Sequence, residues 1–275
     1  MRKLAALALS THPGPTIAVT LITVVLGFSV GLEWWRLLLL GLALLANQVS
    51  VGLSNDWLDA DRDRAVGRTD KPVAIGAIGA GAVRTAAFAS ALFAVALTVP
   101  LGWAATVAHA TFILSAWSYN AGLKSTVISV VPYIISFGLL PLVVTLSLPH
   151  PAIASPWAML AGALLGIAAH FANVLPDLTD DAATGIRGLA HRAGARTAGL
   201  VIAGTLAGAS TSVVLGLGYP QFPGWIGLGL SVVLAVTCAA LVLAGRSTRL
   251  IFRLIIAGAL IDVALLAMSG TRLLA

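Results

Sequence analysis

The stretch LLLLGLALLANQVSVGLSNDWLDADRDR, residues 37–64, decides the fold class of this chain. Residues 37–55 are almost entirely apolar, and they are long enough to cross a hydrocarbon core of ~30 Å as an α-helix. Four aspartates and two arginines follow within residues 56–64. This change in composition predicts a transmembrane helix that ends in a charged cluster at one membrane face.

The same apolar composition extends over the whole chain. Of its 275 residues, 59% are hydrophobic and 9% are charged, whereas soluble domains carry roughly 25% charged residues. We therefore predict an all-α, polytopic membrane protein that forms a single domain over residues 1–275, with about nine transmembrane helices around a central cavity. The expected spans are 15–32, 37–55, 80–100, 103–120, 126–148, 156–176, 198–217, 224–244 and 250–269.

The distribution of charge predicts how the chain is oriented. With this odd number of spans, the N-terminus shares one face with the connections that follow the even-numbered spans, and this face receives most of the Lys and Arg. The positive-inside rule makes that face cytoplasmic, so we expect a cytoplasmic N-terminus and an integral protein of an inner or plasma membrane. The net charge of +6 then suits anionic lipid headgroups and a phosphorylated substrate, and we expect no nucleic-acid partner.

Most of the carboxylates lie on this same face, in two clusters at residues 54–72 and 172–188. Each cluster has the pattern N-x3-D-x3-D-x-A-x-G. The aligned pairs are Asn55 with Asn173, Asp59 with Asp177, Asp63 with Asp181, Ala65 with Ala183, and Gly67 with Gly185. Four spans separate the clusters, so we expect two pseudo-repeated four-helix units plus one helix, with both acidic sites facing one cavity.

The spacing within the first cluster suits a divalent cation. Positions i, i+4 and i+8 place Asn55, Asp59 and Asp63 on one helical face, and Asp56 lies close to Asp59. Like charges at this spacing repel, and oxygen ligands without Cys or His favour Mg²⁺, Mn²⁺ or Ca²⁺ over Zn²⁺. Two such clusters facing each other suggest a diphosphate bridged by metal ions, although Pro176 should interrupt the helix of the second cluster.

Basic residues on the same face would complete a diphosphate site. Arg68 and Lys71 follow the first cluster, Arg187 follows the second, and Lys124 comes shortly after Tyr119. Together with Mg²⁺, these cations would stabilise the charge of a departing diphosphate. The allylic cation left behind would need protection from water, which an apolar cavity inside the membrane provides.

Three segments resemble the UbiA-type intramembrane prenyltransferases. NDWLDADRD at 55–63 and DLTDDAATG at 177–185 are similar to the two aspartate-rich motifs of that family, and YNAGLK at 119–124 is similar to a third segment. The resemblance implies two Mg²⁺ ions bridged by the diphosphate of a prenyl or polyprenyl donor. It also implies a small, aromatic or lipid-linked acceptor, as in 4-hydroxybenzoate polyprenyltransferases and quinone biosynthesis.

The resemblance also implies roles for individual residues. The implied metal ligands are Asn55, Asp59, Asp63, Asp177 and Asp181, with Asp56 as a further catalytic residue. The implied diphosphate contacts are Arg68, Lys71, Tyr119 and Lys124. Two features depart from the family pattern, namely the additional acid Asp180 and the missing basic residue early in the first helix, for which His12 is the nearest candidate.

Several alternatives stay open at this point. A terpene cyclase, or transfer to a phosphate-bearing acceptor, would use the same chemistry, and an ion-coupled transporter would use the acids as ion sites. The acceptor, the donor chain length and the oligomeric state are not predicted. His170 and Asp262 lie within expected spans, where each is either an interhelical hydrogen-bonding group or a functional one.

Overall fold

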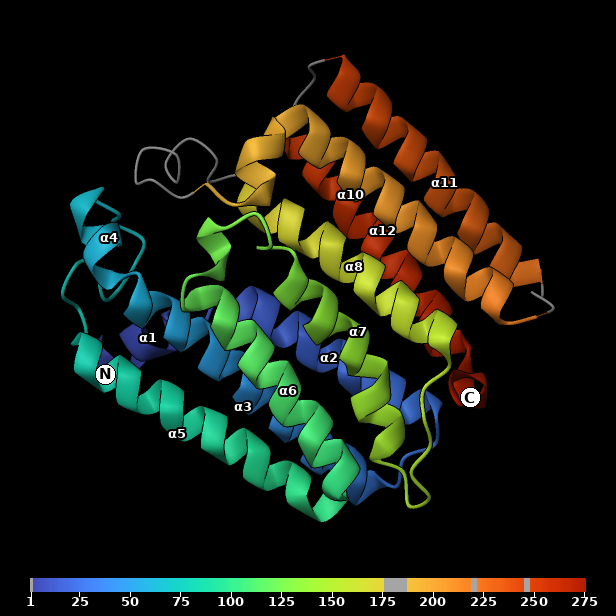
Figure 1. Ribbon diagram of the computed structural model, residues 1–275, viewed down its shortest axis with the longest axis horizontal. Coiled ribbons are helices and arrows are strands. Elements are labelled where there is room, and N and C mark those ends of the chain that lie inside the picture. Colours follow the sequence, from blue (N-terminus) through green and yellow to red (C-terminus); the bar gives the residue numbers. More distant parts are fainter. Residues whose placement is uncertain (1, 176–186, 219–221, 245–247) are drawn as a thin grey trace.

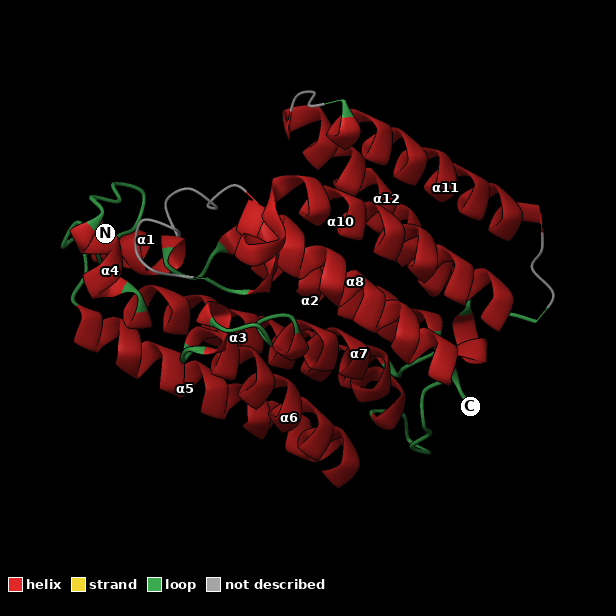
Figure 2. Cartoon of the chain, turned by 45° about the horizontal axis from the view of Figure 1, so that its top comes forward, coloured by secondary structure: helices red, strands yellow, loops and turns green. Residues whose placement is uncertain are grey.

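The computed structural model describes residues 2–175, 187–218, 222–244 and 248–275. Within these ranges the chain is helical apart from its connections, and the only extended pairing is an isolated bridge between Ala154 and Leu274 (Figure 2). The all-α fold that the sequence predicts is therefore confirmed.

The long helices follow the predicted spans closely. They are α2 (Pro13–Ser29), α3 (Trp34–Leu58), α5 (Ala80–Thr98), α6 (Trp103–Asn120), α7 (Val131–Leu146), α8 (Pro156–Val174), α10 (Leu189–Gly216), α11 (Phe222–Leu243) and α12 (Thr248–Met268). The short helices are α1 (Arg2–Leu9), α4 (Ala60–Ala65) and the 3₁₀ turns η1 (Val99–Leu101), η2 (Leu123–Ser125) and η4 (Gly270–Leu273).

One boundary differs clearly from the prediction. Helix α10 begins at Leu189, well before the expected residue 198, because it includes the polar segment that precedes the apolar span. The two parts of α10 meet at Gly194, whose φ of 76° breaks the helical conformation. Glycine adopts this conformation without the steric cost that a side chain would bring, so the helix kinks there.

The helices surround a common centre (Figure 1). Neighbouring contacts run from α2 through α3, α6, α7, α8, α10 and α12, and α12 returns to contact α2. Helix α5 packs outside α3, and helix α11 packs outside α10 and α12. This closed arrangement fits two similar four-helix units followed by α12, as the repeated acidic pattern predicts.

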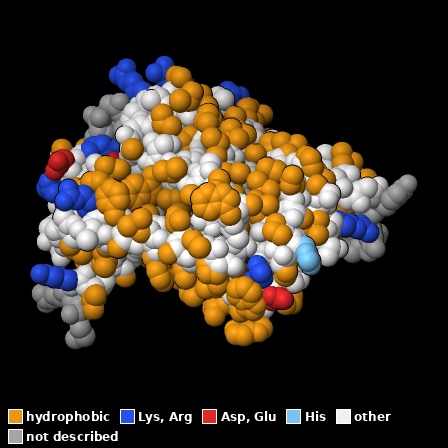
Figure 3. Space-filling model, turned by 60° about the horizontal axis from the view of Figure 1, so that its bottom comes forward, with side chains coloured by type: hydrophobic (Ala, Val, Ile, Leu, Met, Phe, Trp, Pro, Cys, Tyr) orange, Lys and Arg blue, Asp and Glu red, His pale blue; other side chains and the backbone are white. Residues whose placement is uncertain are grey.

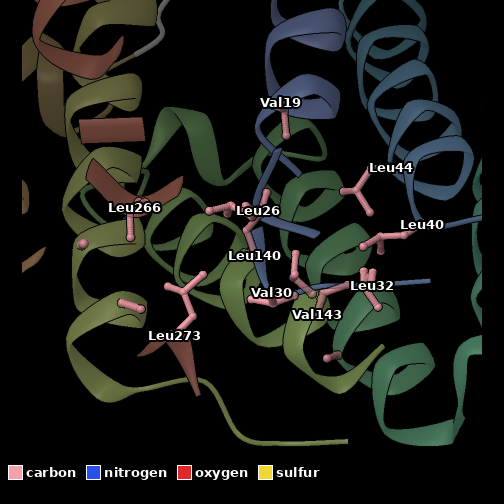
Figure 4. Packing of buried hydrophobic residues seen from close by; sticks show 14 of the residues in the cluster. Val19, Leu26, Val30, Leu32, Leu40, Leu44, Leu140, Val143, Leu266 and Leu273 are labelled. Carbon is pink, nitrogen blue, oxygen red and sulfur yellow. The ribbon is translucent and has the colours of Figure 1, made fainter. Parts of the chain in front are cut away.

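Small residues let the central helices approach closely, which is typical of helix packing in membranes. Gly162 and Gly166 of α8 face α7, and a Cβ at either position would collide with the backbone carbonyl of Phe137 or Tyr133. The packing at the centre is apolar, with Leu26, Leu44 and Leu140 buried among neighbouring helices (Figure 4).

The outer surface suits a lipid environment. Hydrophobic side chains cover the middle of one face, and Lys, Arg, Asp and Glu gather toward its ends (Figure 3). By length and composition, five helices of the described residues are able to cross a membrane, and α1 with α2 would make a sixth if that pair, bent by 60°, forms one span. The chain is a polytopic membrane protein, whereas the count of about nine crossings stays a prediction.

Candidate active site at the acidic end of the cavity

The first acidic cluster lies where α3 ends and α4 begins. The helical hydrogen bonds continue across this junction, because the amide of Asp59 donates to Asn55 O at 2.9 Å and that of Asp63 donates to Asp59 O at 2.8 Å. The predicted common face of Asn55, Asp59 and Asp63 is therefore present, although the long helix itself ends at Leu58.

The acids of this cluster differ in how deeply they are buried. Asp56, Asp59 and Asp63 are 1%, 6% and 3% exposed, whereas the side chain of Asp61 points outward and pairs with Arg64. Buried carboxylates require charged or hydrogen-bonding partners. The partners of these three residues therefore show how the site is built.

Asp59 is held by groups from three segments. Lys124, on the η2 turn, forms a short ion pair with Asp59 Oδ1. Arg62 Nη2 and Asn55 Nδ2 each donate to Asp59 Oδ2 at 3.0 Å. Asn120, at the end of α6, lies 3.4 Å from the same Asn55 amide. The structure thus brings together Asn55, Asp59 and Lys124, which are predicted from distant parts of the sequence.

Burial shifts the pKa of two groups at this end of the cavity. Desolvation, together with the nearby Asp59 carboxylate, raises the pKa of Asp63 above its ordinary value. Desolvation lowers the pKa of the Lys124 amine, and the Asp59 carboxylate opposes this shift. A divalent cation bound near Asp63 would favour its charged carboxylate. A diphosphate bound near Lys124 would favour its charged amine.

Asp56 forms a neighbouring cluster with His12 and Lys71, and Lys71 Nζ links it to the first by lying 3.4 Å from Asn55 Oδ1. Lys71 Nζ donates to Asp56 Oδ1 at 2.7 Å, and His12 Nε2 lies 2.9 Å from that oxygen and 3.0 Å from Lys71 Nζ. His12 connects α1 to α2 with a φ of 53°, an uncommon conformation for a residue with a side chain. The sequence predicts roles for Asp56 and Lys71, but it does not predict that His12 joins them.

Arg68 is oriented by its neighbour Asp70. Its Nε and Nη2 donate to the two oxygens of Asp70, both at 2.8 Å. This bidentate pairing lowers the pKa of Asp70 to about 2. Arg68 lies at the rim of the acidic end rather than among the residues that line the cavity.

The cavity itself has a volume of about 270 Å³ and opens at the acidic end. Its walls come from α2, α3, α6, α7 and α8, and the segment that joins α1 to α2 contributes as well. Asn55, His12 and Tyr119 line it. A second, apolar cavity of about 130 Å³ shares Val19, Phe137 and Ala169 with the first and continues between α2, α7, α8, α10 and α12.

An aromatic cluster forms one wall. Tyr133 lies edge-on to Tyr119, with ring centroids 5.1 Å apart, and is parallel to Phe137 within 10°. His170 lies outside the lining residues, 5.2 Å from the Tyr133 ring, and its Nε2 is 3.2 Å from Ser129 Oγ. His170 therefore packs against the aromatic cluster without lining the cavity.

Part of the predicted site falls outside the described residues. Asp177, Asp180 and Asp181 belong to this part, so their positions relative to Asp59 are untested. Within the described residues, no group of three or more His, Cys, Asp and Glu side chains is placed to hold a metal ion. The oxygens of Asn55, Asp59 and Asp63 are nevertheless of the type that Mg²⁺ prefers.

Comparison with known proteins identifies the family. The model of the UbiA prenyltransferase family matches residues 16–268. The chain belongs to the UbiA prenyltransferase family. It is a prenyltransferase and an integral membrane protein, and the transporter alternative is set aside. Among curated proteins, none matches the chain.

Solved structures share the UbiA fold with this chain. A UbiA homolog from Archaeoglobus fulgidus bound to GPP and Mg²⁺ is 14% identical, with a TM-score of 0.70 over 99% of this chain and 98% of that one. The apo UbiA homolog from Aeropyrum pernix K1 is 18% identical, with a TM-score of 0.71 over 91% and 96% of the two chains. A digeranylgeranylglyceryl phosphate synthase is 15% identical, with a TM-score of 0.63 over 98% and 99%.

Several residues of this UbiA site have no clear signal in the sequence. Asn120 lies in the YNAGLK segment that resembles the family, but the sequence gives it no role, whereas in the structure it accepts from Asn55 and donates to Val51 O at 2.9 Å. Tyr133 is one aromatic residue in an apolar span, and only the fold places it beside Tyr119. Gln48 reads as an interhelical hydrogen-bonding group, whereas the structure places it on the cavity wall.

Proposed function

We propose that this chain transfers a prenyl group from its diphosphate to a small aromatic acceptor, with Mg²⁺ and the donor diphosphate at the acidic end of the cavity. The relatives solved with GPP or DMAPP and Mg²⁺ support this donor class and this metal. The observation that carries the proposal is the cluster of Asn55, Asp59 and Lys124 at the end of a cavity that is apolar farther inside.

The metal site would draw on both aspartate-rich motifs. Asn55, Asp59 and Asp63 would supply oxygens from the first motif, and Asp177 and Asp181 would supply them from the second. We propose two ions, one for each motif, since each Mg²⁺ usually takes one or two carboxylates and fills its shell with water and phosphate oxygens. Bound Mg²⁺ would neutralise negative charge on the diphosphate.

Side chains of the protein would bind the diphosphate and stabilise its charge as it leaves the donor. Lys124 now pairs with Asp59, and it would turn to a phosphate oxygen when Asp59 binds metal. Lys71, Arg68 and the hydroxyl of Tyr119 would donate further hydrogen bonds. As the carbon–oxygen bond of the donor breaks, the electron pair leaves with the diphosphate, and these donors stabilise its charge.

The apolar interior would serve the remaining steps. The prenyl tail would extend past Val19 and Phe137 into the second cavity, which excludes water from the allylic cation. A ring carbon of the acceptor would attack the cation, form the new carbon–carbon bond, and then lose its proton to restore aromaticity. We place the acidic end at the cytoplasmic face, following the distribution of Lys and Arg.

The test compares Asp59→Asn with Asp61→Asn in purified, correctly folded protein. Asp59 is buried and held by Lys124, whereas Asp61 lies on the surface of the same cluster. We expect Asp59→Asn to lower Mg²⁺-dependent product formation by at least about 100-fold, comparable to the loss of one electrostatic contact to a developing charge in other enzymes. Asp61→Asn should stay within about twofold of the parent. Full turnover in Asp59→Asn would contradict the proposed role.

A further inference from the structure

Gln48 is a cavity residue that the reaction above does not use. It lies on α3 two turns before Asn55, about 10 Å along the helix axis away from the acidic end. Its side chain lines the cavity. This position places an amide in the interior part of the chamber, where the reacting carbon atoms of donor and acceptor would meet.

Most other polar side chains of the cavity wall are already engaged with the protein. His12 contacts Asp56, Asn120 donates to Ser54 Oγ at 2.8 Å, and Ser136 donates to Phe112 O at 3.4 Å. Of the polar side chains that line the cavity in the described part of the chain, those of Gln48 and Asn173 form no hydrogen bond or ion pair. A ligand is therefore free to bind these two amides.

The charge of the cavity restricts the kind of ligand. Among the described residues, the lining contains no Lys, Arg, Asp or Glu, and its one histidine, His12, contacts Asp56 and Lys71 at the acidic end. Residues 176–186 contain no Lys or Arg in their sequence. The nearby amines, Lys71 and Lys124, lie at the acidic end beside Asp56 and Asp59, where the proposed function uses them for the donor diphosphate. A carboxylate or phosphate placed beside Gln48 would lose its water without gaining a cation, which is unfavourable.

We propose that the cavity beside Gln48 takes an uncharged, hydroxylated aromatic acceptor rather than one that carries a carboxylate or a phosphate. This inference rests on the proposed function and names the acceptor class. An amide both donates and accepts hydrogen bonds, and a phenolic hydroxyl matches it in both respects. The rings of Phe112, Tyr133 and Phe137 line the same space and suit an aromatic ring.

The first experiment compares two acceptors that differ by one carboxylate. The full chain in lipid nanodiscs is given Mg²⁺, geranyl, farnesyl or geranylgeranyl diphosphate, and either hydroquinone or 2,5-dihydroxybenzoate. We expect kcat/KM for hydroquinone to exceed that for 2,5-dihydroxybenzoate by at least about tenfold, since an unpaired buried charge is more costly than a lost neutral hydrogen bond. Equal or better use of the carboxylated acceptor would overturn the inference while leaving prenyl transfer intact.

Variants at Gln48 test whether this residue sets the preference. Gln48→Leu should raise KM for hydroquinone about threefold to tenfold and leave KM for the donor unchanged, as expected for one lost hydrogen bond. Gln48→Lys supplies a cation and should shift the ratio of the two kcat/KM values toward 2,5-dihydroxybenzoate by about tenfold or more. Thr111→Val is the matched control, because Thr111 is exposed on α6 and does not line the cavity.

The outcomes separate this inference from the function on which it rests. An unchanged acceptor ratio in a Gln48→Lys protein that still releases diphosphate from the donor would overturn the inference alone. Conversion of the donor to a cyclic product, without transfer to either acceptor, would overturn both the inference and the proposed function. A hydroquinone preference that disappears in Gln48→Lys and persists in Thr111→Val would support both.

Discussion

Each buried acid of the first motif has a basic residue nearby, and for Asp56 and Asp59 this partner comes from another segment of the chain. Asp56 pairs with Lys71, Asp59 pairs with Lys124 and Arg62, and Arg62 also lies 3.6 Å from Asp63. Such pairs keep the basic side chains in place before any substrate arrives. A diphosphate with its metal ions would then bind to side chains that are already positioned, which reduces the cost of reorganisation.

The Arg68–Asp70 pair leads to a prediction about donor binding. Asp70→Asn should remove the bidentate contact that orients Arg68 and raise KM for the prenyl diphosphate by up to about fivefold, with unfolding free energy at pH 7 changing by less than about 1 kcal/mol because the pair is exposed. The lowered pKa means that the pair stabilises the folded chain above pH 3.8, and this contribution is lost as pH falls from 3.8 to about 2.

Steady-state kinetics and thermal melting at pH 7 and at pH 3 check this prediction, with Asp61→Asn as the control. Asp61 also pairs with an arginine at the surface, but it lies on the outer side of α4. The destabilisation caused by Asp70→Asn should be smaller at pH 3 than at pH 7. A donor KM that rises only in the Asp61 variant would contradict the proposed role of Arg68.

His12 yields a second prediction at this scale. His12→Ala removes the ring that contacts Asp56 and leaves an alanine at a positive φ, so we expect a loss of stability of about 1–3 kcal/mol and lower activity. His12→Asn should retain more of both, because asparagine tolerates this conformation and still offers a hydrogen-bonding group. Melting temperature and turnover of the two variants, measured side by side, check this order. Equal losses in both variants would contradict this order and the explanation given for it.

At the scale of the helices, the sequence predicts where most of the helices lie. It does not predict where a helix ends or kinks. Apolar segments of membrane length predict the positions of α3, α5, α6 and α8 to within a few residues. The end of α3 at Leu58 and the kink at Gly194 depend on local backbone conformation and on contacts between segments. Hydrophobic periodicity encodes neither of these features. Because the first part of α10 is polar and is joined to the apolar span at this kink, its early start could not be predicted.

The close contact of α7 with α8 gives a prediction at this scale. Gly166→Ala would force the two helices apart at Tyr133, with an expected cost of about 1–3 kcal/mol in stability and a loss of activity through the displaced aromatic wall. Gly204→Ala on α10 is the matched control, because an added Cβ there meets nothing within 4 Å. The control should be neutral or slightly stabilising, by up to about 1 kcal/mol. Thermal melting in detergent distinguishes the two, and similar effects from both changes would argue against the tight contact.

At the scale of the whole molecule, the repeated acidic pattern predicts two similar halves, which no single helix would indicate. The contact of α3 with α5 has a counterpart in that of α8 with α10, as expected if the two halves share a plan. The pairs of Lys71 with His12 and of Lys124 with Asp59 form within the first half, between segments that are 59 and 65 residues apart in the chain. The ligand types of the site could therefore be predicted from the sequence, whereas the pairing of each acid could not.

The orientation of the bundle in the membrane is the last prediction. Helix α4 and the connection between α7 and α8 lie at opposite ends of the molecule, and exposed Trp34 and Trp103 begin α3 and α6 at the end away from α4 (Figure 1). Trp is enriched at membrane–water interfaces, and the basic residues lie mainly near α4, so we expect α4 in the cytoplasm. The single native cysteine, Cys238, is buried, which leaves a low background for labelling introduced cysteines.

Asp61→Cys and His150→Cys provide matched probes, because both positions are exposed and lie at the two ends. In sealed, inside-out vesicles, a membrane-impermeant maleimide should label residue 61 rapidly and residue 150 only after detergent is added. Right-side-out vesicles should give the opposite result, since the reagent then reaches only the other end. Labelling of residue 150 from the cytoplasmic side would place the acidic end outside the cell. Donor diphosphates made in the cytoplasm would then have no direct access to Asp59 and Lys124.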